Sequence, residues 1–155
     1  MTIQRLKVDP KTIDLMITAI VLERRERFQH AGHYAFLAMG RVMSKSLPEE
    51  EGPTTPTNFS WRLDQLVKEK GMPREWSKKV YALWIKIRFY LYQKVSTIPN
   101  YQSRSIKAFV ESVMFILEQT AGIKFEDFLS TLTFEDKERL QRQFGDSLVP
   151  EENFG

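Results

Sequence analysis

Few side chains in this sequence could carry out chemistry. The chain has two histidines, His30 and His33, no cysteine and no glycine-rich phosphate loop. Because catalysis needs suitable groups held within hydrogen-bonding reach, most enzyme classes lack their usual signature here. Neighbouring carboxylates such as Glu126 and Asp127 diverge on a helix, so we predict no metal site and no cofactor. The sequence therefore predicts a protein that binds rather than catalyses.

Two pairs of arginine and histidine offer a catalytic alternative. Four residues separate Arg25 from His30, and five separate Arg27 from His33. This spacing resembles the Arg-x4-6-His motif of the HEPN ribonucleases. The resemblance implies a dimeric helical bundle that cleaves RNA, with histidine as acid or base and arginine stabilising the phosphorane. Glu26 stands where that family has a polar residue and would repel a phosphate, so a solvated, charged face inside a long first helix is the other interpretation.

That first helix is predicted from its cap and its apolar spacing. Asp9 followed by Pro10 is typical of a helix start, since the Asp side chain accepts from free backbone amides and Pro fits the first turn. Apolar residues then recur at spacings of three and four as far as Met43. Gly32 lowers helix propensity by about 1 kcal/mol relative to Ala, so we expect a bend or break near it.

Further helices are expected along the rest of the chain. Gly71 is a typical helix end, and Thr133 with Asp136 forms an imperfect capping box. The predicted helices are 59–70, 74–97, a helix capped by Asn100 or Ser103 and reaching Gly122, a short segment at 125–132, and 133–144.

The whole pattern predicts an all-α fold, a helical bundle of five to six helices. No segment alternates apolar and polar residues over the length of a strand. A chain of 155 residues fits one domain, which we place at 1–145, with a C-terminal tail at 146–155. Three prolines and an acidic triplet predict a flexible loop at 44–58. With no signal peptide and no apolar run of about 20 residues, we expect a cytoplasmic protein without membrane contact.

The helix expected at 74–97 has a basic side and an apolar side. Lys79 and Lys86 lie on one side, and Arg88 falls within the opposite, apolar arc. A guanidinium there needs an anion, either the carboxylate of Glu111 or Glu118 or a bound phosphate. Aromatic residues widen the apolar arc, which indicates a core packed on two sides or an exposed aromatic strip. The residues of the predicted core arc are Val80, Trp84, Ile87, Leu91 and Val95.

Basic residues elsewhere extend this candidate nucleic-acid interface. The net charge of +3 is modest, so it matters only where cations gather. Arg104 and Lys107 stand near a helix start, whose free amides also favour phosphate. Binding to the phosphate backbone would not depend on base sequence and would weaken with salt. The predicted binding residues are Arg24, Arg25, Arg27, Lys79, Lys86, Arg88, Arg104 and Lys107.

In size, helical character, basic charge and lack of cysteine, the chain resembles the small subunit of class 1 CRISPR effector complexes. Residues 98–118, IPNYQSRSIKAFVESVMFILE, also resemble the helical C-terminal region of the type I-D large subunit. The resemblance implies copies packed side by side in a Cascade-like, RNA-guided antiviral complex, with guide RNA, target DNA and other effector subunits as partners. We therefore expect a non-catalytic subunit that stabilises the guide–target duplex or the displaced DNA strand. A helical protein–protein adaptor is the remaining alternative.

Overall fold

The chain folds into a bundle of helices. The computed structural model describes residues 6–47, 52–92 and 100–146, and these contain seven α-helices and no strand. The prediction of an all-α fold is confirmed, and the predicted count of five to six helices is too low. The elements are α1 (Pro10–Arg24), α2 (Phe28–Ser46), α3 (Phe59–Lys70), α4 (Arg74–Ile87), the 3₁₀ turn η2 (Tyr90–Tyr92), α5 (Asn100–Ala121), α6 (Phe125–Leu129) and α7 (Phe134–Phe144).

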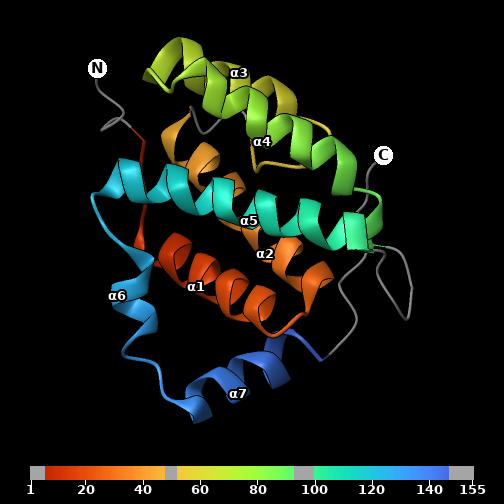
Figure 1. Ribbon diagram of the computed structural model, residues 1–155. Helices are drawn as coiled ribbons and strands as arrows, with labels where there is room; N and C mark the ends of the chain where they lie inside the picture. The colour runs from red at the N-terminus through yellow and green to blue at the C-terminus, as the bar shows by residue number, and fades with distance from the viewer. Residues whose placement is uncertain (1–5, 48–51, 93–99, 147–155) are drawn as a thin grey trace.

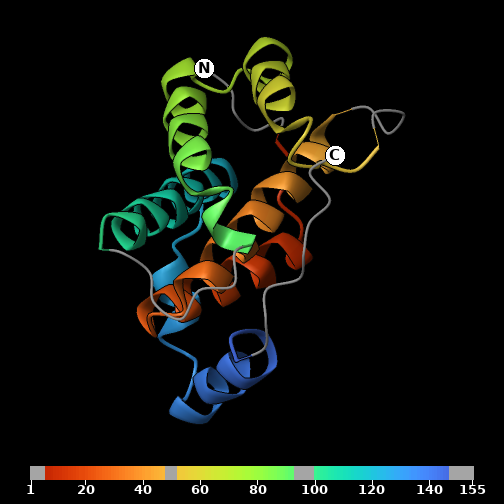
Figure 2. The same ribbon diagram turned by 90° about the vertical axis from the view of Figure 1, so that its right-hand side faces the viewer.

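The helices are arranged around α2 and α5. The chain reverses after α1, so α2 packs back along it, while α5 packs against both α2 and α4 (Figure 1). At one end α3 packs on α2 and α4. At the other end α6 and α7 lie against α1, with α7 on the outside of the bundle (Figure 2). The molecule therefore has a packed centre and one peripheral helix.

Four aromatic rings from four helices form the middle of the core. The ring of Phe36 on α2 stacks on Trp84 of α4, with 4.3 Å between centroids. Phe59 of α3 and Phe109 of α5 lie 5.3 and 5.9 Å from the same indole. All four side chains are buried. The described part of the predicted core arc, from Val80 to Leu91, is also buried and so confirmed, whereas Val95 lies outside the described residues.

The first helix ends earlier than predicted. α1 stops at Arg24, and Glu26 takes a left-handed conformation with φ of 61°. The amide of Arg27 donates to the carbonyl of Leu22 at 2.8 Å, and that of Glu26 donates to Glu23 at 3.0 Å. This pair of bonds is the Schellman motif, which normally uses glycine at the left-handed position. The predicted break near Gly32 is wrong, because the chain reverses at Glu26.

Gly32 has a different role, in packing the end of α4 onto α2. A Cβ at Gly32 would lie 2.6 Å from Cδ2 of Leu91, so a larger residue there would displace the Leu91 side chain. Gln29 on the same helix donates to the carbonyl of Tyr90 at 2.8 Å. The predicted helix 74–97 is therefore wrong at 88–92, where the chain turns and buries Leu91 against α2; residues 93–97 lie outside the described residues.

Local capping signals are mostly confirmed. Asp9 accepts from the amide of Thr12 at 2.9 Å, and Gly71 ends α3 with φ of 77°. Thr133 and Asp136 exchange side-chain and backbone hydrogen bonds of 2.9 and 3.0 Å, which completes the capping box. Ser103 is not a cap, because α5 already begins at Asn100.

The predicted loop at 44–58 is partly helical and partly anchored. α2 continues to Ser46, and residues 48–51 lie outside the described residues. Past that gap, the buried guanidinium of Arg62 donates to the hydroxyl of Thr54 at 2.8 Å and to the carbonyl of Gly52. Arg62 of α3 thus fixes residues 52–54, the part of the loop that leads into α3.

Candidate nucleic-acid interface

A groove of about 1270 Å³ lies between the start of α1, the second half of α2, residues 52–54 and the end of α3. Its described lining contains one acidic side chain, Glu69. Its cations come from three separate segments of the chain. We call this feature the basic groove, and its cationic residues are Lys7, Lys11, Arg41, Lys45 and Lys70.

The start of α1 is fixed on α2 beside this groove. Nε and Nη2 of Arg41 donate to the carboxylate of Asp9 at 2.8–3.0 Å. The Arg41 guanidinium is the main reason that the pKa of Asp9 lies well below its ordinary value. The backbone amide of Lys7 also donates to Ser46 Oγ at 2.8 Å. These bonds hold Lys7 and Lys11 of one segment beside Lys45 of another.

The opposite wall depends on the buried Arg62. Its Nη1 donates to Thr54 Oγ1 at 2.8 Å and lies 3.2 Å from Ser44 Oγ, so α2, the loop and α3 share one hydrogen-bond network. Thr54 Oγ1 in turn donates to the carbonyl of Gly40 at 2.9 Å. With the wall held in this way, Lys70 at the end of α3 faces the same groove as the α1 and α2 cations.

The four lysines of the basic groove form no ion pair with a described residue, whereas Arg41 is paired with Asp9. Three of them are exposed and Lys70 is half-buried. Ammonium groups gathered in a concave surface attract anions more strongly than the same charges spread over a convex one. The groove is therefore a candidate site for an anionic ligand.

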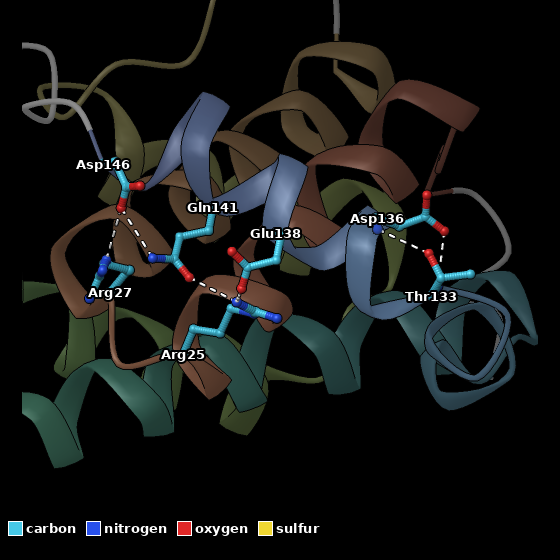
Figure 3. A network of polar contacts seen from close by, with 7 residues as sticks. All are labelled: Arg25, Arg27, Thr133, Asp136, Glu138, Gln141 and Asp146. Atoms are coloured by element: carbon cyan, nitrogen blue, oxygen red, sulfur yellow. Dashed lines mark hydrogen bonds and ion pairs between the residues drawn. The ribbon is translucent and has the colours of Figure 1, made fainter.

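The three predicted arginines near the end of α1 face acidic partners instead. Arg24 pairs with Glu126 of α6, and Arg25 pairs with Glu138 of α7. Arg27 lies 3.3 Å from Asp146, just beyond α7 (Figure 3). We call Arg24, Arg25 and Arg27 the arginine cluster. In this structure its charges hold the C-terminal segment.

The predicted residues on α4 and α5 are exposed but interrupted by acids. Lys79 lines a small groove that also contains Glu75 and Glu111. Lys107 interacts with Glu23, which also interacts with Arg24. Lys86 and Arg104 are exposed on the same two helices. The structure therefore does not bring the eight predicted residues into one uninterrupted basic surface.

Arg88 is paired with neither predicted carboxylate among the described residues. Its guanidinium lies 4.6 Å from the centroid of the Phe89 ring, and its Nε is buried without a hydrogen-bond partner there. The carboxylate of Glu118 accepts from the amide of Phe125 at 2.8 Å instead. The predicted partnership with Glu118 is therefore corrected: that carboxylate helps to start α6.

The arginine–histidine pairs are not set inside one long helix. Arg25 is the C-cap of α1, and its Nη1 lies 3.0 Å from Gln141 Oε1 on α7. His33 is buried in α2 with its Nδ1 3.0 Å from the hydroxyl of Tyr92. Burial, with a smaller effect of His30, lowers the pKa of His33 to about 4. A neutral, enclosed imidazole of this kind is a poor proton donor at neutral pH.

Sequence reasoning missed the lysines of the basic groove. Lys7 and Lys11 flank the start of α1, Lys45 lies near the end of α2, and Lys70 ends α3. No segment contains more than two of them, so they form no cluster in the sequence. The one local signal was position: each lies near a helix end, where loops bring separate helices together.

The described residues contain no group of three or more histidines and carboxylates that could hold a metal ion. No helix in the described ranges is long and apolar enough to cross a membrane. Comparison with protein-family models, with curated proteins and with solved structures found no match to this chain. Its function must therefore be inferred from its own geometry and charge.

Proposed function

We propose that this chain is a non-catalytic nucleic-acid-binding subunit that holds a phosphate backbone in the basic groove. The observation that supports this proposal is the convergence of Lys7, Lys11, Lys45 and Lys70 on one concave surface, without acidic partners among the described residues. Lysines that neutralise phosphates release counterions, which gives affinity without base recognition.

The setting of this activity follows from the resemblance in the sequence. A small basic helical subunit of an RNA-guided CRISPR effector would hold guide RNA, target DNA or the displaced strand by its backbone. The proposal therefore predicts binding to single strands and duplexes alike, with a strong dependence on salt.

Fluorescence anisotropy with labelled single-stranded DNA, duplex DNA and an RNA–DNA hybrid tests the proposal at about 50 and 200 mM salt. Three triple variants, each removing three positive charges, identify the surface. K11Q/K45Q/K70Q changes the basic groove, and K79Q/K86Q/K107Q changes the exposed faces of α4 and α5. K68Q/K124Q/K137Q is the charge-matched control. These three lysines line neither the basic groove nor the faces of α4 and α5; Lys68 and Lys124 are exposed and Lys137 is half-buried.

The groove variant should lose most of the affinity, and the slope of log K against log salt should fall by about 2 for single strands, given ~0.7 per phosphate contact. Equal weakening in all three variants would show that only net charge matters. The acidic triplet at 49–51 lies outside the described residues, so E49Q/E50Q/E51Q belongs in the same series. Tighter binding by that variant is expected if the triplet competes for the groove.

A protein-binding adaptor is the second candidate. The small groove between α4 and α5, about 350 Å³, is lined by Trp76, Phe115, Val80 and Ile116 among others. The Trp76 and Phe115 rings meet edge to face with 5.0 Å between centroids, and Phe115 is exposed. Such exposed aromatic surface is typical of protein interfaces. Absence of oligonucleotide binding even at low salt would favour this candidate.

The ribonuclease alternative has less support from the geometry. Arg25 is bonded to α7, and His33 is buried and neutral. RNA incubated with the wild-type chain and with H30A should remain uncleaved in both. Cleavage that depends on His30 would revive this alternative.

A further inference from the structure

The C-terminal helix α7 and Asp146 just beyond it cover two members of the arginine cluster, Arg25 and Arg27, through polar contacts. None of the α7 side chains is fully buried. Glu138 and Gln141 bond the guanidinium of Arg25, and Asp146 bonds Arg27 (Figure 3). Apolar contacts add to these bonds: Leu140 and Phe144 are partly buried against the core, and Phe144 meets Tyr34 of α2 edge to face with 5.4 Å between centroids. With no fully buried side chain, α7 is docked less firmly than the core helices, and the more exposed of its ion pairs, Arg27 with Asp146, is screened by salt.

The preceding helix α6 is attached differently. Phe125 and Leu129 of α6 are buried in the core, and the amide of Phe125 bonds the carboxylate of Glu118. α7 also caps its own N-terminus through Thr133 and Asp136, so it needs no partner to satisfy those backbone groups. The attachment of α6 to the core therefore does not depend on α7. The joint between the two helices lies at residues 130–133.

The groups that α7 presents to the arginine cluster imitate phosphate. A carboxylate and a phosphate oxygen accept the same charge-assisted hydrogen bonds from a guanidinium. The side chain of Arg25 is 20% exposed beneath Glu138, and that of Arg27 is 41% exposed beside Asp146. Without α7 both guanidinium groups would face solvent next to Arg24, at the reversal between α1 and α2.

We infer that α7 is an autoinhibitory cover, which competes with nucleic-acid phosphates for Arg25 and Arg27. This inference rests on the proposed function of the basic groove. A strand held in that groove gains additional phosphate contacts at the arginine cluster only when α7 has left it. The C-terminal helix thus sets how much of the strand the subunit holds.

Two variants release α7 by different means. E138Q/D146N removes the carboxylates that pair with Arg25 and Arg27 and leaves Glu126 on Arg24. Gly145→Val changes no charge: a Cβ at Gly145 would lie 2.6 Å from Cδ2 of the buried Leu22 and 3.0 Å from the carbonyl of Gln141. The matched control is D127N/E135Q, which removes two exposed carboxylates that form no ion pair with a described residue.

Hydrogen exchange of the α7 amides and anisotropy with labelled single-stranded DNA test the inference in the full chain. Both release variants should exchange faster in α7 than the wild type and the control. They should also bind DNA several-fold more tightly, with a salt slope steeper by about 1, given ~0.7 per added phosphate contact. Adding R25Q/R27Q to the Gly145→Val variant should abolish the gain.

The possible failures are distinct. If the control gains as much affinity as E138Q/D146N and Gly145→Val gains none, the effect is one of net charge and the cover does not exist. If the groove variant loses DNA affinity but both release variants bind DNA as the wild type does, the proposed function stands and this inference fails. If no variant binds at low salt, both fail.

Discussion

The guanidinium of Arg41 on α2 donates hydrogen bonds to the carboxylate of Asp9 at the start of α1, with donor–acceptor distances of 2.8–3.0 Å. The same carboxylate accepts from the backbone amide and the hydroxyl of Thr12. One side chain therefore caps α1 and fastens it to α2. It also sets the position of one wall of the basic groove.

This pairing predicts acid sensitivity. The pKa of Asp9 is depressed in the folded chain, chiefly by Arg41, so its contribution to stability is complete above the unfolded value near 3.8 and is lost as pH falls below it. Asp9→Ala should cost about 1–2 kcal/mol at pH 7 through the lost cap alone. Asp9→Asn retains a capping acceptor and should cost less. Urea unfolding from pH 7 down to about pH 2 checks this: the gap in stability between wild type and Asp9→Asn should stay constant above pH 3.8 and narrow steadily below it, and a gap that is unchanged at the lowest pH would contradict it.

His33 predicts a second pH dependence in a different range. Burial lowers its pKa from the ordinary value of 6.5 to about 4, so the unfolded chain takes up a proton before the folded chain does. Stability should be complete above pH 6.5 and decline as pH falls towards 4, by at most about 3 kcal/mol. His33→Gln should be less stable at pH 7 but should lose little more at pH 5. A parallel decline in both proteins would assign the effect to other groups.

Glu26 predicts a stabilising substitution. Glu26 has a φ of 61°, a left-handed conformation that is strained for any residue with a Cβ. It occupies the position of the Schellman motif that normally holds glycine. Glu26→Gly should raise the free energy of unfolding by about 0.5–1 kcal/mol, even though glycine increases the entropy of the unfolded chain. Glu26→Ala keeps the Cβ and serves as the control. An equal gain in both variants would point to the lost charge instead.

The stacked rings of Phe36 and Trp84 predict the largest loss of stability. Trp84 is buried where α2, α3, α4 and α5 meet, so Trp84→Ala should cost about 3–5 kcal/mol. Its Nε1 has no hydrogen-bond partner among the described residues, so Trp84→Phe should cost clearly less. Trp61 is 51% exposed, and Trp61→Ala should change stability by less than about 1 kcal/mol. Chemical denaturation with circular dichroism measures all three, and similar losses at Trp61 and Trp84 would contradict the packing.

Much of the helical organisation could be predicted because it depends on neighbours in the sequence. The caps at Asp9, Gly71 and Thr133 form bonds within a few residues, so their residue types reveal them. The end of α4 could not be predicted in the same way. It is set by Gln29 and Gly32 on another helix, which draw η2 onto α2.

The reversal at Glu26 was hidden for a related reason. Its hydrogen bonds are local, but the residue at the left-handed position is not the glycine that usually marks it. The packing of α2 along α1 stabilises a conformation that the residue itself disfavours. Tertiary structure here overrides local preference.

The sequence by itself determined the all-helical class, most of the helix ends and the apolar arc of α4, because these follow from spacing and local hydrogen bonding. Only the tertiary structure decided which basic residues are paired with carboxylates and which are free of such ion pairs among the described residues. It set Arg25 against Glu138, a partner 113 residues away, and gathered Lys7, Lys45 and Lys70 from three helix ends into one groove. The physical reason is that a charge attracts a ligand according to the charges around it in space, and spatial neighbours are fixed only when the helices pack.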